Sequence, residues 1–136
     1  MIIQKEIVLP AFRRGFHLIT RLITDAAGEL PEAGLINVFI HHTSAGLCIN
    51  ENADPTVRED FETTFNRLVP EFLRLYVHDC EGSDDMPAHI KSSLTGQSLT
   101  IPVSNKHLKL GVWQGIYLCE FRKNGGRRKI TVTVWG

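Results

Sequence analysis

The sequence lacks the cysteine pattern of a disulfide-stabilised protein. Its three cysteines, Cys48, Cys80 and Cys119, are odd in number, lie far apart and form no Cys-x-x-Cys pair. This spacing argues against a disulfide framework and against a structural zinc site closed by cysteines. Free thiols suit a reducing compartment, so we expect a cytoplasmic protein.

The chain also lacks an excess of charge of either sign and a long hydrophobic run. Its 15 basic and 15 acidic residues cancel, so no general field attracts nucleic acid or an anionic membrane. No segment approaches the roughly 20 apolar residues of a membrane-spanning helix. Gln4, Lys5 and Glu6 interrupt the first apolar segment too early for a signal peptide. We therefore expect neither nucleic acid nor a membrane as a partner.

The chain does contain clear strand and helix patterns. Alternating and β-branched runs predict strands at residues 2–9, 35–42, 47–51, 99–103, 113–121 and 130–134. Apolar residues at helical spacing predict helices at residues 19–27, 55–69 and 86–94, whereas residues 71–77 match neither period. Gly125 and Gly126 indicate a hairpin turn between the last two strands. The 136 residues fit one α+β domain, residues 1–136, with a mainly antiparallel sheet and two or three packed helices.

Two short segments contain most of the side chains that can bind a metal ion or carry a proton. The first runs from His41 to Pro55, and the second runs from His78 to His89. Both hold histidines and carboxylates, and neither matches a named zinc motif. We predict that the fold brings the two segments together as the halves of one site.

Three histidines are the candidate metal ligands. His42 ends the apolar row of the strand at 35–42, where an imidazole needs a metal ion, a substrate or a backbone group as its partner. His78 and His89 flank an acidic loop, although unrelated surface histidines would give the same pattern. If the three converge, they leave an open coordination position on a divalent ion, zinc or magnesium, as catalytic sites do.

Several neighbouring polar residues allow two interpretations each. Asn50, Asn52 and Asp54 alternate along an extended path and would point to one side, where they can contact a substrate. Asp54 also precedes a proline, which is the pattern of a helix N-cap. Asp84 and Asp85 can hold Mg²⁺ through carboxylate oxygens or cap the helix that follows them.

The last third of the chain adds polar residues in apolar surroundings. Gln114 and Glu120 interrupt an apolar strand, so each is either paired in the core or lines a site. A basic group surrounds the last turn and either stays solvated or receives a phosphate. Its members are Arg122, Lys123, Arg127, Arg128 and Lys129.

Four motifs carry a resemblance to a known family. They are His42–Ala45 (HTSA), Asn50–Pro55 (NENADP), Met86–Leu94 (MPAHIKSSL) and Gly111–Glu120 (GVWQGIYLCE). In this order, and nearly end to end, the chain resembles the YjbQ-like family, also called the secondary thiamine-phosphate synthase family. That family usually has threonine where this chain has Val112, so a hydroxyl contact at this position is missing here.

The resemblance implies a compact β-sandwich with helices, a homotrimeric assembly and a weak thiamine-phosphate synthase activity. This transferase reaction joins two small-molecule substrates, a pyrimidine pyrophosphate and a thiazole phosphate. The leaving pyrophosphate must be neutralised by a metal ion or by basic side chains, and we assign Lys91 and Arg122 to that role. The other assignments are His42, Asn52, Asp54 and Gln114 as catalytic or substrate-positioning residues, and His42, His78 and His89 as ligands of a divalent metal.

Two other functions fit the same residues. One is a hydrolase or another metal-dependent enzyme with incidental synthase activity, which a turnover number far below about 1 to 1,000 per second would favour. The other is a trimeric protein that binds a metabolite without converting it.

Overall fold

The computed structural model describes all residues from 1 to 136 and contains eight strands and three helices. The strands are β1 (Ile2–Val8), β2 (Gly15–Leu18), β3 (Ala33–Ile40), β4 (Ala45–Glu51), β5 (Ser98–Ser104), β6 (His107–Leu108), β7 (Gln114–Glu120) and β8 (Lys129–Trp135). The helices are α1 (Thr20–Ala27), α2 (Pro55–Leu68) and α3 (Asp85–Thr95). All three predicted helices are present, whereas β2 and β6 are strands that the apolar pattern does not predict. None of the helices has the length and apolar character needed to cross a membrane.

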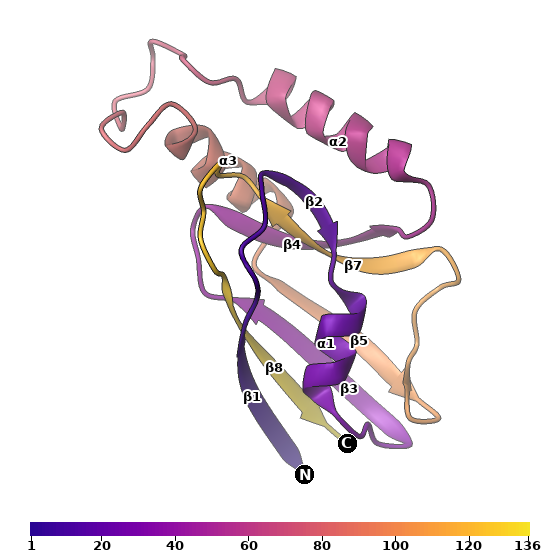
Figure 1. Cartoon of the computed structure of the whole chain (residues 1–136). Helices are drawn as coiled ribbons and strands as arrows, with labels where there is room; N and C mark the ends of the chain where they lie inside the picture. The colour runs from indigo at the N-terminus through magenta and orange to yellow at the C-terminus, as the bar shows by residue number, and fades with distance from the viewer.

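The strands form two antiparallel sheets. The larger sheet has the order β1-β8-β3-β5-β6, and the smaller has the order β2-β7-β4. Helices α2 and α3 lie on the outer side of the smaller sheet, and α1 lies beside the space between the sheets (Figure 1). The predicted α+β fold, a mainly antiparallel β-sandwich with helices packed against it, is confirmed.

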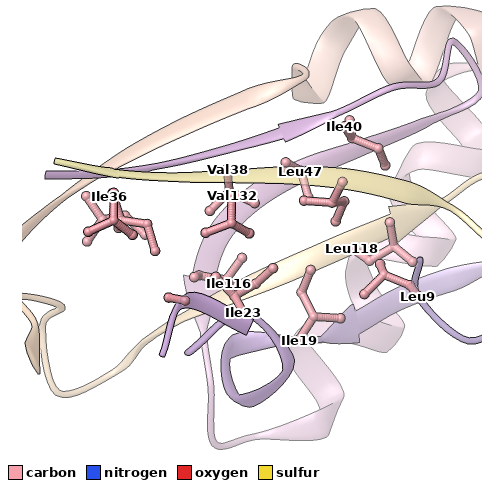
Figure 2. Close-up of a cluster of buried hydrophobic side chains, with 14 of the residues drawn as sticks. Leu9, Ile19, Ile23, Ile36, Val38, Ile40, Leu47, Ile116, Leu118 and Val132 are labelled. Atoms are coloured by element: carbon pink, nitrogen blue, oxygen red, sulfur yellow. The ribbon is translucent and has the colours of Figure 1, made fainter. Parts of the chain in front are cut away.

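The main core lies between the two sheets. Figure 2 shows side chains of the larger sheet, such as Ile36 and Val38, facing Leu47 and Ile116 of the smaller sheet. Ile23 of α1 is fully buried in the same cluster. A second, aromatic cluster lies on the other face of the smaller sheet, under α2 and α3, and contains Phe16, Ala88, Tyr117, Cys119 and Phe121. β7 is therefore covered on both faces, as its apolar sequence indicates.

The segment between β7 and β8 is not the hairpin that Gly125 and Gly126 indicate. β7 pairs with β2 and β4, whereas β8 pairs with β1 and β3, so the chain crosses from one sheet to the other. The hairpin prediction is wrong because a turn signal is local, while long-range pairing decides which sheet each strand joins.

A buried ion pair joins the two ends of this crossing. Nε and Nη2 of Arg128 donate to the two carboxylate oxygens of Glu120 at 2.7 and 2.6 Å, and both side chains are almost fully buried. Gly125 lies against the pair, where the Cβ atom of any other residue would collide with the carboxylate of Glu120. Glu120 is thus paired in the core, and Arg128 ties the end of β7 to the start of β8.

Candidate functional site

Two histidines and one aspartate converge at the start of α3. Nε2 of His78 lies 2.7 Å from Oδ2 of Asp85, and Nε2 of His89 lies 3.2 Å from the same oxygen. These three atoms all lie within 4.8 Å of one another. The side chain of Asp85 is only 2% exposed, whereas those of His78 and His89 are 44% and 32% exposed. The group therefore has a rigid, buried carboxylate and two imidazoles that solvent or an ion can reach.

The ring of His89 is held in one orientation by the other polar segment. Nδ1 of His89 lies 2.9 Å from the carbonyl oxygen of Thr43, which can only accept, so Nδ1 carries the proton. In the neutral imidazole this leaves a lone pair on Nε2, and that lone pair faces an oxygen of Asp85. Two acceptors do not attract each other, whereas a cation between them would bind both. A second hydrogen bond, from Ser92 Oγ to the carbonyl oxygen of Ala45 at 2.6 Å, holds α3 against β4.

Arg122 holds the carboxylate of Asp85 in place. Nη1 of Arg122 donates to Oδ1 of Asp85 at 2.6 Å, and Nε donates to Oδ2 of Asp84 at 3.2 Å. Burial raises the pKa of Asp84, but the backbone N–H of Lys123 and the charge of Arg122 outweigh burial and lower the pKa below its ordinary value. The guanidinium thus orients Asp85 and leaves Oδ2 free to face the histidines, as an outer partner of a metal ligand does.

His42 does not belong to this group. Its Nε2 accepts a hydrogen bond from the backbone N–H of Lys129 at 2.8 Å, just after the end of β3. Burial and then the charge of Arg128 lower the pKa of His42 below its ordinary value, which keeps the ring neutral. The structure therefore brings together two of the three predicted histidines, and Asp85 takes the third place.

The sequence pattern indicates Asp85 less directly, as an Mg²⁺ ligand or a helix cap. Asp85 lies inside the first turn of α3, and the preceding Asp84 makes no capping hydrogen bond with its side chain. The signal available in the sequence is the spacing of Asp85 and His89, which places both on one helix face at i and i+4.

Three other predicted site residues lie at the far end of the smaller sheet. The side-chain amide of Asn52 donates to the carbonyl oxygens of Val112 and Gln114, each at 3.1 Å. Oε1 of Gln114 accepts from the backbone N–H of Gly111 at 2.7 Å. Asp54 caps α2, because its carboxylate accepts from the N–H of Thr56 at 2.9 Å, which lowers the pKa of Asp54. A seven-residue strand such as β4 spans about 20 Å, so these residues lie far from the histidines.

Lys91 lies in the interior between α2 and α3. The residue is 2% exposed, and Nζ donates to Oδ1 of Asn66 at 2.7 Å. Burial and then the charge of Arg14 lower the pKa of Lys91 below its ordinary value. Lys91 and Arg122, the two cations assigned to the leaving pyrophosphate, are thus both bonded to other protein groups.

A cavity opens beside His78. It has a volume of about 450 Å³, and its walls combine apolar side chains with the polar loop that precedes α3. Phe72, Leu73, Tyr76 and Met86 line it together with Arg74, His78, Asp79, Gly82 and Ser83. Four of these nine residues come from the segment at 71–77, which has no regular structure and carries no periodic signal in the sequence. The cavity therefore could not be found from the pattern.

The neutral state of His42 makes a testable contribution to stability. Its pKa is lower in the folded chain than in the unfolded chain, so the unfolded chain binds more protons as the pH falls through about 6.5. The free energy of unfolding should therefore decrease with falling pH in this range. We expect His42→Gln, whose amide oxygen can still accept from Lys129, to lose less stability than the wild type between about pH 7.5 and about pH 5.5. Urea denaturation at both pH values measures the difference, and equal losses would contradict this role.

Comparison with known proteins identifies the family. Residues 5–136 match the family model described as UPF0047 protein YjbQ-like. A Salmonella typhimurium protein with the name UPF0047 protein YjbQ is 53% identical over 135 residues, which cover 98% of this chain and 97% of the relative. The protein of the same name from Escherichia coli O157:H7 is 49% identical over the same coverage of both chains.

Solved structures give the same result. A conserved hypothetical protein of Thermus thermophilus superposes with a TM-score of 0.82 at 36% identity, covering 94% of this chain and 97% of that one. A YjbQ/UPF0047-family protein of Clostridium acetobutylicum has a TM-score of 0.79 at 39% identity, covering 98% and 99% of the two chains. The names of these proteins state no reaction. The resemblance carried by the four motifs is confirmed, and the chain belongs to the YjbQ-like UPF0047 family.

Proposed function

We propose that this protein is a metal-dependent enzyme that converts a small molecule at a divalent ion held by His78, Asp85 and His89. The observation that carries the proposal is the convergence of Nε2 of His78 and Nε2 of His89 on Oδ2 of Asp85, at 2.7 and 3.2 Å. Arg122 donates to the other oxygen of that carboxylate, so Oδ2 and the two imidazoles face a common space that a divalent cation could fill. Two imidazoles with one carboxylate suit zinc better than magnesium, which prefers oxygen ligands.

The chain contributes three functions around such an ion. His78 and His89 supply nitrogen ligands, Asp85 supplies a charged oxygen, and Arg122 with Thr43 fixes the orientation of two of the three ligands. With these three protein ligands, a divalent ion would have an open position at which it could polarise a substrate oxygen or activate a water. The cavity of about 450 Å³ is the place from which a substrate reaches that position.

The reaction that we favour is the weak thiamine-phosphate synthase transfer implied by the family resemblance. The cavity offers Phe72 and Tyr76 for a flat ring and Arg74 for a phosphate group. Arg74 forms no ion pair, unlike Arg122, so its charge is available to a leaving pyrophosphate. In this transfer the bond between the pyrimidine methylene and the pyrophosphate breaks, and a bond to the thiazole nitrogen forms.

A hydrolase is the second candidate, because an open metal position can also activate a water molecule for attack on the substrate. A metabolite-binding protein without turnover is the third. In each case we propose a homotrimer in the cytoplasm. Two exposed apolar side chains of the segment before α3, Leu75 and Val77, support lasting contacts with another chain.

Removal of the metal tests the enzyme proposal. We expect protein treated with a chelator to lose product formation from the pyrimidine pyrophosphate and the thiazole phosphate, and zinc or another divalent ion to restore it. Mass spectrometry of the products separates transfer from hydrolysis, because hydrolysis releases the pyrimidine alcohol without consuming the thiazole. Full activity in verified metal-free protein would contradict the proposal.

A further inference from the structure

A second hollow lies along α2 and shares no lining residue with the cavity beside His78. It is an open groove of about 620 Å³ between α2 and the chain around β2, which runs beneath α2 in Figure 1. Arg13, Arg14, Gly15, Phe16 and His17 form one wall, and Pro55, Arg58, Glu59, Glu62 and Thr63 form the other. Phe16 is the only large apolar side chain among them. The groove is therefore built for a polar ligand.

The three arginines of the groove differ in how they are paired. Arg14 is neutralised by Glu62, at 3.3 Å, and by Glu71. Arg13 and Arg58, on opposite walls, form no ion pair with any acidic residue. Two guanidinium groups thus face the same hollow with their charges available.

Arg58 also has an unsatisfied donor. Its Nε is buried and has no hydrogen-bond partner, and it is the only such side-chain atom in the structure. A buried N–H without a partner is unfavourable and rare in folded proteins, so the guanidinium of Arg58 would gain by shifting to meet an acceptor in the groove. The acidic residue Glu59 lies on the same helix but provides no bond to Arg58.

The opposite wall is held in a fixed shape. Nε2 of His17 donates to the carbonyl oxygen of Arg13 at 2.7 Å, and the ring of His17 stacks on Phe12 with a centroid distance of 4.7 Å. These contacts tie the backbone of Arg13 to β2. The backbone that carries this cation is thereby kept beside the groove before any ligand binds.

We infer that this groove binds a small polar molecule through a phosphate group, with Arg13 and Arg58 as its two cationic contacts. A phosphate carries three acceptor oxygens and can accept from the guanidinium groups of both walls at once. The side chains of Thr63 and Glu59 are then available to form hydrogen bonds with hydroxyl groups on the rest of the ligand. The volume lies in the range of small-molecule sites. The groove shares no residue with His78, Asp85 and His89, so the inference stands whether or not a metal binds there.

Calorimetric titration of the full-length protein with inorganic phosphate, in a chloride buffer, tests the inference. We expect saturable binding that Arg58→Gln and Arg13→Gln each weaken by about tenfold or more. Glu59→Gln should strengthen binding, because it removes the unpaired negative charge from the groove. A gain of affinity cannot result from misfolding, which keeps the test valid if an arginine variant is unstable. Arg21→Gln on α1, a 94% exposed arginine, is the matched control and should leave the affinity unchanged.

Two further measurements distinguish phosphate binding in the groove from binding to an ion at the histidines and from unspecific anion binding. Asp85→Asn should retain phosphate binding, whereas binding to an ion at the histidines would be lost in that variant. Acetate should bind more weakly than phosphate. The inference is overturned if phosphate shows no saturable binding at millimolar concentrations, if both arginine variants bind like the wild type, or if acetate binds as tightly.

Discussion

Asp85→Asn should reduce the affinity for a divalent ion by about 100-fold or more, the largest functional effect expected of any single substitution. Asparagine has nearly the same shape, but it removes the negative charge and one of three ligands. Asp85 is also the ligand that both histidines face, at 2.7 and 3.2 Å. Competition with a metal-binding dye measures the affinity, and circular dichroism checks that the fold is retained.

The ion affinities of two other variants serve as references for the affinity of Asp85→Asn. Arg122→Gln leaves all three ligands in place but removes the donor that orients Asp85, so we expect a loss of about 10- to 100-fold. Glu81→Gln is the matched control, because this exposed carboxylate lies in the same loop and forms no ion pair. If Asp85→Asn binds the ion as tightly as Glu81→Gln does, Asp85 is not a ligand.

Arg128→Met should lower the free energy of unfolding by about 3–5 kcal/mol, the largest stability effect that we expect. The substitution keeps most of the side-chain volume but leaves the carboxylate of Glu120, which is fully buried, without its cation. An unpaired buried charge is far more costly than the loss of an exposed pair. Arg127→Met, at the exposed neighbouring position, removes two hydrogen bonds to the carbonyl oxygens of Val8 and Leu9 but leaves no charge buried, so it should cost only about 1–2 kcal/mol.

Urea denaturation at neutral pH measures both values. The double variant Glu120→Leu with Arg128→Met should recover most of the lost stability, because it removes both charges together. A loss below about 1 kcal/mol in Arg128→Met would contradict the structural role of the pair between the sheets.

Much of the fold follows from short-range patterns. The apolar spacing of Ile19, Ile23 and Ala27 identifies α1, and Asp54 before Pro55 marks the start of α2. The pattern does not predict β2, because the four residues Gly15–Leu18 are too few to show the alternation of a strand. Short-range patterns do not predict the crossing from one sheet to the other after β7, because the pairing partners of a strand lie far away in the sequence.

The sequence predicts that histidines and carboxylates form the candidate site. It predicts less well which individual residues belong to it. His78 and His89 stand out as histidines beside an acidic loop, and the structure brings them together. His42 resembles them in sequence, yet β3 ends at Ile40 and the imidazole bonds to the backbone of Lys129. The position of Asp85 at the start of a helix favours a capping role, so the sequence does not indicate its contact with the histidines. No sequence pattern shows that Arg122 orients Asp85, since 37 residues separate the two.

Anomalous scattering from a crystal of protein purified without any chelator would decide whether the histidines and Asp85 hold a metal ion. Data collected on both sides of the zinc absorption edge would locate the ion and identify it at once. We predict one peak per chain, about 2.0 to 2.2 Å from Nε2 of His78, Nε2 of His89 and Oδ2 of Asp85. A protein that copurifies with stoichiometric metal but shows its peak elsewhere, for example at His42, would contradict the proposed site, as would the absence of any peak after zinc is added.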